Sequence, residues 1–177
     1  SFPHKTVEGT VTLSGSKSIS NRVLMIRALS GSNFKIENLS DSQDTSILDQ
    51  LLTKDMDLFD VHHAGTTFRF LTAYLALKSG EQVLTGSERM KQRPIKALVD
   101  ALNQLGADIE YMEKEGFPPL LIKNPKPKWE NTISLPAHIS SQYISALLLI
   151  APKLEQGLNL VIEGELTSKP YVQMTLA

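Results

Sequence analysis

The chain has 177 residues, enough for one ordinary domain, or a portion of a larger protein, with a substantial hydrophobic core. Hydrophobic residues make up 41% and charged residues 21%, which is typical of a globular protein and too polar for a membrane protein. The 18 basic and 19 acidic residues give a net charge of −1, so a general nucleic-acid-binding surface is not expected and any anion site has to be local.

The chain contains no cysteine, which excludes disulfides, thiolate metal ligands and a cysteine nucleophile, and favours a reducing compartment. The N-terminal stretch SFPHKTVEGT has no apolar leader region, and no run approaches the roughly 18 apolar residues of a membrane span. We therefore expect a soluble, cytoplasmic protein with no membrane partner.

The N-terminal part alternates predicted strands and helices. Strands are predicted at 7–15, 33–40 and 58–61, where apolar residues alternate with polar ones or form a short run. One helix is predicted from about Ser20 to Gly31, and a second follows the N-cap candidates Asp41 and Ser42. Phe68, Phe70, Leu71, Tyr74 and Leu75 have helical spacing within a predicted buried helix at 65–80, and are predicted to be core.

The remaining elements continue the alternation. Pro94 is predicted at the first position of a helix that Gly106 ends, and Pro170 at the first position of the last helix, 168–177. An apolar helix with Ser140 or Ser141 as its N-cap is predicted over 140–157. Strands are predicted at 81–87, 107–112, 118–124, 131–137 and 157–165.

These elements form an internal repeat. Each of three strongly apolar helices is followed by a glycine, a strand and a second helix; the apolar helices start near Ser20, Thr66 and Ser141, and the second helices near Ser42, Pro94 and Pro170. The sequence thus predicts an α/β or α+β domain made of three copies of a strand–helix–strand–helix unit, the last incomplete, with helix starts at one edge.

Cations cluster at three of the predicted helix starts. Lys17 and Arg22 flank the first, Arg89, Lys91 and Arg93 precede Pro94, and Lys169 precedes Pro170. The N-terminus of a helix is electropositive, so cations there are unfavourable unless they share an anion with the free N–H groups. Small residues beside these points would let the backbone approach such an anion: Gly15, Ser16, Ser18, Gly65, Thr66, Thr67, Ser140, Ser141 and Ser168. The alternative is that these residues are ordinary caps and the cations are solvated.

Five sequence motifs together resemble those of one enzyme family and so indicate which ligand is bound. GSKSISNR, HAGTTFR, RMKQRPI, SSQYISALL and SKPY occur in the order and approximate spacing of the 5-enolpyruvylshikimate-3-phosphate (EPSP) synthase family, which the chain resembles over nearly its whole length. The resemblance implies an inside-out α/β barrel built from repeated βαβαββ units, here truncated. It implies a strand or hinge segment at 1–16, leading from a partner domain. Residues 17–177 would be a partial shikimate-3-phosphate-binding domain of about two and a half repeats.

The resemblance also implies an activity. Members of the family are 3-phosphoshikimate 1-carboxyvinyltransferases of the shikimate pathway, which makes aromatic amino acids. They transfer the enolpyruvyl group of phosphoenolpyruvate to the 5-hydroxyl of shikimate 3-phosphate and release phosphate, without a metal or organic cofactor. The expected partners are these two small molecules and the C-terminal domain of the same protein, with a monomer as the full-length form.

Site residues follow from the matched motifs alone. The resemblance implies that Lys17 is catalytic and contacts phosphoenolpyruvate, together with Gly65, Thr66 and Arg93. It implies that shikimate 3-phosphate is bound by Ser18, Arg22, Ser140, Ser141, Gln142, Ser168 and Tyr171.

Two features depart from the family pattern. His63 stands where the family usually has asparagine, and the stretch from Lys54 to Val61 is shorter than in many members. The acidic groups for proton transfer, and further cations that bind phosphoenolpyruvate, are expected beyond Ala177, so we expect this chain to bind ligand without turning it over.

Two other functions are compatible with parts of the sequence. A related transferase acts on UDP-N-acetylglucosamine, but it typically has a cysteine ahead of its Arg-Pro, and GSERMKQRP has none. A module that only binds a phosphorylated ligand is a second alternative. His62 and His63 do not predict a metal site, because neighbouring residues of a strand point in opposite directions and no second ligand cluster is present.

Overall fold

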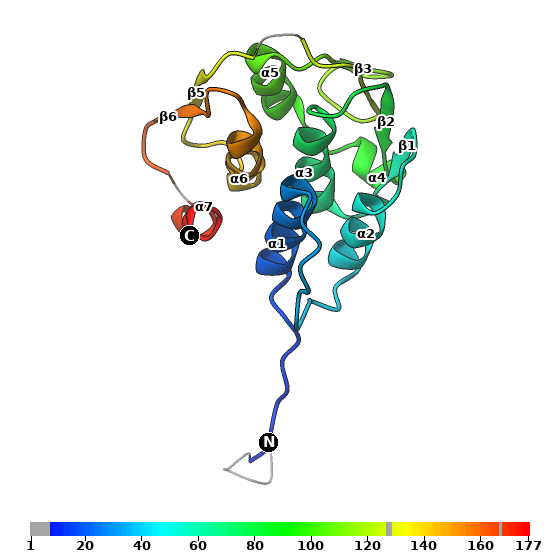
Figure 1. The fold of residues 1–177 in the computed structure, drawn as a ribbon, viewed down its shortest axis with the longest axis vertical. Coiled ribbons are helices and arrows are strands. Elements are labelled where there is room, and N and C mark those ends of the chain that lie inside the picture. The colour runs from blue at the N-terminus through cyan, green and yellow to red at the C-terminus, as the bar shows by residue number, and fades with distance from the viewer. Residues whose placement is uncertain (1–7, 127–128, 167) are drawn as a thin grey trace, which may run out of the picture.

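The computed structural model describes residues 8–126, 129–166 and 168–177. Helices and strands alternate along the chain (Figure 1). Their bounds are α1 (Lys17–Ser30), α2 (Gln43–Leu52), β1 (Leu58–Asp60), α3 (Gly65–Leu75), β2 (Gln82–Thr85), α4 (Glu88–Lys91), α5 (Lys96–Leu105), β3 (Ile109–Tyr111), β4 (Leu120–Ile122), β5 (Thr132–Pro136), α6 (Ser141–Ile150), the 3-10 helix η1 (Ala151–Lys153), β6 (Asn159–Glu163) and α7 (Lys169–Leu176).

The strands form two sheets. In the four-stranded sheet the order is β1-β2-β4-β3, with β1 and β2 parallel and the other neighbours antiparallel. β5 and β6 form a parallel pair. The succession β1–α3–β2–α5–β3–β4 is one βαβαββ unit that also contains the short α4, and β5–α6–β6–α7 begins in the same way. The predicted α/β class is therefore confirmed.

Three helices contact one another at the centre of the domain: α1, α3 and α6. α3 is buried on nearly every side, as expected of a helix that is apolar all round. Its predicted core residues Phe68, Phe70, Leu71 and Leu75 are fully buried, whereas Tyr74 is half-buried. None of the described helices is long and apolar enough to cross a membrane.

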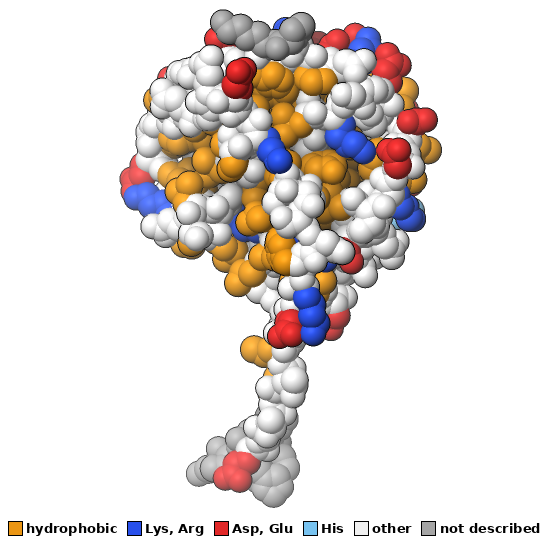
Figure 2. Space-filling model, viewed as in Figure 1, with side chains coloured by type: hydrophobic (Ala, Val, Ile, Leu, Met, Phe, Trp, Pro, Cys, Tyr) orange, Lys and Arg blue, Asp and Glu red, His pale blue; other side chains and the backbone are white. Residues whose placement is uncertain are grey.

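Two predicted strands are wrong. Residues 8–15 run away from the body of the domain (Figures 1 and 2), and Val11 and Leu13 are 81% and 80% exposed. Residues 33–40 also form no strand. Alternation of apolar and polar residues favours an extended backbone, but a strand also needs a hydrogen-bonding neighbour, and no described backbone pairs with either segment. Val7 lies outside the described residues.

Several helix boundaries differ from the predicted ones. α1 begins at Lys17, three residues earlier than expected, because the Ser16 hydroxyl accepts a hydrogen bond from the backbone N–H of Ile19. α5 begins two residues after Pro94, since the N–H of Ile95 donates to the carbonyl of Gly116 at 2.9 Å. α4 was not predicted at all; Ser87 caps it.

The two long apolar helices are shorter than predicted. α3 gives way to turns after Leu75, before the predicted end at Gly80. α6 ends at Ile150 and passes into η1, where Pro152 has no N–H to continue the helix. Ser140, one of the two predicted caps, is the N-cap of α6.

Candidate anion-binding site

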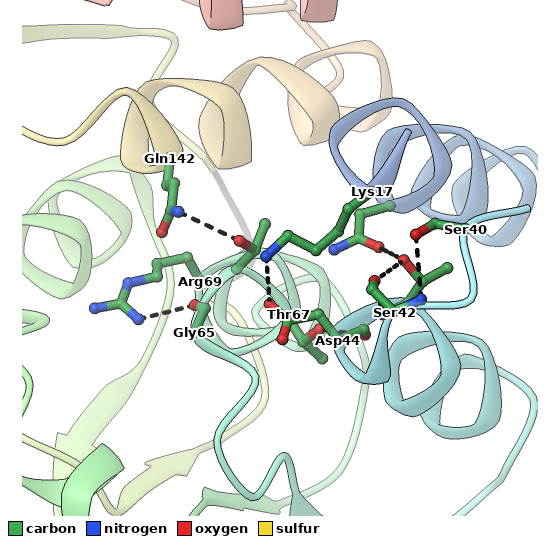
Figure 3. A network of polar contacts seen from close by, with 11 residues as sticks. Lys17, Ser40, Ser42, Asp44, Gly65, Thr67, Arg69 and Gln142 are labelled. Carbon is green, nitrogen blue, oxygen red and sulfur yellow. Dashed lines mark hydrogen bonds and ion pairs between the residues drawn. The ribbon is translucent and has the colours of Figure 1, made fainter. Parts of the chain in front are cut away.

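Four helix N-termini converge on one cavity, as the repeat predicted for the apolar helices. Lys17 and Gln142 reach toward the first turn of α3 from α1 and α6 (Figure 3). The cavity has a volume of about 310 Å³ and is lined by Lys17, Ser18, Arg22, Thr66, Phe70, Ser141, Gln142 and Tyr171. Its charged lining residues are both cations, and the surrounding helix starts supply backbone N–H groups, so the arrangement suits an anion.

Lys17 is the first residue of α1 and is available to a ligand. Its Nζ lies 3.5 Å from Oδ2 of Asp44, in the first turn of α2, and its side chain is 47% exposed. A long, partly exposed ion pair of this kind contributes about 1 kcal/mol or less. An incoming anion can therefore compete with Asp44 for the ammonium group.

The start of α6 is tied to the start of α3. The Gln142 amide donates to the Thr66 hydroxyl at 3.2 Å, which fixes two lining side chains against each other. Ser140 uses its hydroxyl to accept from the N–H of Gln142 at 3.3 Å and does not line the cavity. Ser141 does line it, so the two neighbouring serines have different surroundings.

Arg22 is buried and strongly anchored. Its guanidinium makes four hydrogen bonds, to the Ser18 carbonyl at 2.9 Å, Ser145 Oγ at 2.8 Å, the Tyr171 carbonyl at 2.9 Å and Thr175 Oγ1 at 2.7 Å. Burial lowers the pKa of Arg22. Because a guanidinium has five N–H donors, one donor on Nη1 has no partner among the described residues and could serve a ligand in the cavity.

Arg93 lies at a different helix start from the one that the cation pattern predicted, and beside Gly65, with which the motif resemblance grouped it. A Cβ atom on Gly65 would come within 2.0 Å of the Arg93 Nη1 atom, so the guanidinium lies against the first residue of α3 rather than at the start of α5. It lines a second cavity of about 560 Å³, with His63, Ser87, Arg89 and Met90. Gly65 and Thr66 are adjacent, so the two cavities are neighbours at the N-terminus of α3.

Arg69 is a charged residue of this region that the sequence analysis missed. It is 5% exposed, and its Nη1 donates to the Gly65 carbonyl at 2.8 Å. Burial and the nearby charge of Arg93 both lower the pKa of Arg69. The available signal was a lone cation inside the apolar run FRFLTAYLAL.

Other predicted residues lie apart from the cavity. Ser168 is the N-cap of α7 without a side-chain capping bond, and Lys169 is exposed; neither lines the cavity. His63 places its Nδ1 2.9 Å from the Oγ of Ser87. Among the described residues, no group of three or more histidine or acidic side chains is arranged to hold a metal ion.

The fold and the cavity define an α/β protein with a candidate anion site at converging helix N-termini. The family model of EPSP synthase (3-phosphoshikimate 1-carboxyvinyltransferase) matches residues 2–54 and 46–177. The chain therefore belongs to the EPSP synthase family, and the resemblance drawn from the motifs is confirmed.

Individual relatives agree with this family membership. A 3-phosphoshikimate 1-carboxyvinyltransferase of Bacteroides fragilis (strain YCH46) is 49% identical over 170 residues, which cover 96% of this chain and 41% of the relative. One from Mannheimia succiniciproducens is 42% identical, covering 98% and 47%. A solved EPSP synthase of Acinetobacter baumannii has the same fold, with a TM-score of 0.75 at 18% identity, and covers 93% of this chain and 42% of its own. The chain spans under half the length of the curated relatives it matches.

Proposed function

We propose that the protein to which this chain belongs transfers the enolpyruvyl group of phosphoenolpyruvate to the 5-hydroxyl of shikimate 3-phosphate. The observation that supports this most directly is the convergence of the N-termini of α1, α3, α6 and α7 on a cavity whose charged lining is Lys17 and Arg22. Membership of the EPSP synthase family supplies the identity of the substrates.

Shikimate 3-phosphate is assigned to the cavity of about 310 Å³. The residues that would hold it there are Ser18, the free Nη1 donor of Arg22, Ser141, Gln142 and Tyr171, all of which line the cavity. Ser140 and Ser168 remain predicted contacts, although neither side chain lines it. Hydroxyl, amide and guanidinium donors suit both the phosphate and the ring hydroxyls of this ligand.

Phosphoenolpyruvate is assigned to the neighbouring start of α3. Gly65 and Thr66 present backbone N–H groups, Arg93 lies against Gly65, and Lys17 approaches from α1. In the proposed reaction the 5-hydroxyl oxygen adds to carbon 2 of phosphoenolpyruvate while carbon 3 takes a proton. The proton of the 5-hydroxyl goes to a general base. The tetrahedral intermediate then loses phosphate together with a proton from carbon 3, which leaves the enolpyruvyl ether. Lys17 and Arg93 would offset the phosphate and carboxylate charge throughout, which is a large contribution in a closed site.

We propose that the enzyme is cytoplasmic, needs no cofactor and is a monomer at full length. We also propose that its general acid and base lie outside residues 1–177. The absence of cysteine supports a reducing compartment. Size-exclusion chromatography with light scattering on the full-length protein would test the monomer.

Calorimetry on this chain tests the proposed ligand. Shikimate 3-phosphate should bind at least tenfold more tightly than shikimate, because the phosphate adds charge-assisted hydrogen bonds. Ser141→Ala should weaken that binding, whereas Ser134→Ala, in β5 and away from the cavity, should not. Equal affinity for both compounds, or equal effects of both variants, would contradict the assignment. A phosphate-release assay on the full-length protein would then separate an enzyme from a module that only binds.

A further inference from the structure

A buried tyrosine connects the two arginines at the N-terminus of α3. The Tyr143 hydroxyl, from α6, donates to the carbonyl of Pro94 at 2.7 Å. Pro94 directly follows Arg93 in the chain, so this bond fixes the backbone from which the Arg93 side chain leaves. Tyr143 is 9% exposed, and α3 and α6 are in extensive contact.

The same tyrosine lies near Arg69. Its phenol oxygen is close enough to the Arg69 guanidinium to oppose the effect of burial on the pKa of Arg69. Arg69 in turn donates to the Gly65 carbonyl at 2.8 Å, and the Arg93 guanidinium lies against the α-carbon of Gly65. Two hydrogen bonds and the close approach of Arg93 to Gly65 therefore connect Pro94 to Tyr143 and Arg69 to Gly65, with the Tyr143 phenol beside the Arg69 guanidinium.

Burying the charged Arg69 side chain at this position costs free energy. It is almost fully buried, has no carboxylate partner in the part of the chain that the structure describes, and lies near a second arginine. Burying a charge without an opposite charge is costly, and an apolar side chain would avoid that cost. What an apolar residue could not do is donate a hydrogen bond to the Gly65 carbonyl.

We propose that Tyr143 and Arg69 are positioning residues that hold the Arg93 guanidinium over the first turn of α3. Neither side chain lines the two cavities, so neither is a ligand contact. Their effect on binding is exerted through Arg93. The inference rests on the proposed function in one respect, since the anion bound by Arg93 is taken to be phosphoenolpyruvate.

Tyr143→Phe removes one hydroxyl and leaves the packing of the ring in place. We expect affinity for phosphoenolpyruvate to fall about tenfold, the effect of losing one well-placed hydrogen bond. Binding of shikimate 3-phosphate in the neighbouring cavity should stay within twofold of the unchanged chain.

Arg69→Lys keeps the charge but lacks the planar fork of the guanidinium, and should show the same selective loss of affinity for phosphoenolpyruvate. Tyr74→Phe is the matched control, because Tyr74 is a half-buried tyrosine of α3 whose hydroxyl has no hydrogen bond to a described residue.

A second measurement needs no ligand. The Nε–Hε signal of Arg93 in nitrogen-15 NMR, assigned by its loss in Arg93→Lys, should report an ordered side chain in the unchanged chain and increased mobility in Tyr143→Phe. An equally ordered Arg93 in that variant would overturn the positioning role, as would equal losses for both ligands. If the unchanged chain bound shikimate 3-phosphate but no phosphoenolpyruvate, the proposed function would be contradicted at this subsite, while the Arg93 signal would still decide the role of Tyr143.

Discussion

The guanidinium of Arg93 occupies the space that a side chain on Gly65 would require. A Cβ atom there would lie 2.0 Å from Nη1, 2.8 Å from Cζ and 2.9 Å from Nη2 of Arg93. Real Cβ contacts essentially never fall below 3.0 Å, so any residue larger than glycine has to displace the arginine. Glycine at the first position of α3 therefore serves the close approach of a cation to a helix N-terminus.

Gly65→Ala should weaken anion binding at the start of α3 without unfolding the protein. The alanine methyl group displaces the flexible end of Arg93, and one charge-assisted contact is worth about 1.5–3 kcal/mol. We expect phosphoenolpyruvate, titrated against the chain by NMR, to bind more weakly by about that amount. The backbone signals of Gly65 and Thr66 would be followed in the unchanged chain.

A double-mutant cycle checks that the effect passes through Arg93. If it does, adding Gly65→Ala to Arg93→Ala should cause little further loss, because the displaced group is already gone. Additive losses would show that the methyl group acts on the ligand or on α3 directly, and would contradict the role given to the glycine.

Gly15→Ala should disturb the start of α1. A Cβ atom on Gly15 would lie 1.8 Å from the Asn38 carbonyl oxygen, which is backbone and cannot rotate away. The segment before the Ser16 cap would have to move, and Lys17 with it. We expect a melting temperature lowered by several degrees, as for a loss of about 1–2 kcal/mol. Gly9→Ala, with no atom within 4 Å of the added Cβ, is the control and should melt like the unchanged chain.

Arg22→Ala should destabilise α7 and its packing against the domain. Val172 is the buried residue of that helix, and Arg22 supplies hydrogen bonds to both the Tyr171 carbonyl and Thr175. We expect a loss of about 2 kcal/mol in the free energy of unfolding, because buried polar partners lose their donor. Hydrogen exchange at residues 172–176 should accelerate more than elsewhere. Unchanged protection of α7 would contradict this anchoring.

Arg27→Ala is the matched variant for that experiment. Arg27 lies on the same helix, but its ion pair with Asp49 is partly exposed, and such pairs contribute about 1 kcal/mol or less. It should leave the exchange of α7 unchanged.

Tyr111 should make stability fall at alkaline pH. Its hydroxyl is buried without a hydrogen-bond partner among the described residues, and burial raises the pKa of Tyr111 from 10.0 to about 12. The unfolded chain loses this proton near pH 10, whereas the folded chain keeps it. The contribution is therefore fully present below about pH 10 and is lost as the pH rises toward 12.

Tyr111→Phe removes this titration. Urea unfolding at pH 8 should give a free energy within about 1 kcal/mol of the unchanged chain, since the lost hydroxyl was unsatisfied. Above pH 10 the variant should become progressively more stable than the unchanged chain. Parallel curves for Tyr111→Phe and the unchanged chain would rule out the raised pKa.

The sequence predicted the helices well, because helix formation depends mainly on residues that are close together in the chain. Helical spacing of apolar residues and capping serines placed the three central helices, and their starts do converge. The strands predicted at 7–15 and 33–40 failed because pairing depends on a neighbour that the segment itself does not specify. The partners of Arg22 on α7 were not predictable either, since they lie far from it in sequence. The grouping of Arg93 with Gly65 came only from the motif resemblance and not from local sequence signals.

The last prediction is that residues 1–177 alone release no phosphate from phosphoenolpyruvate and shikimate 3-phosphate. Phosphoenolpyruvate carries close to three negative charges, and this chain offers chiefly Lys17 and Arg93 against them. Lys17 is 47% exposed, and an ion pair in contact with water contributes about 1 kcal/mol or less. Proposed general acid–base groups outside this segment would each have supplied about 10²–10⁴-fold. A phosphate-release assay should therefore read background with this chain, and rise when the remaining length of the protein is added as a separate folded piece. Robust release by residues 1–177 alone, abolished by Lys17→Ala, would show instead that the whole catalytic set lies within this sequence.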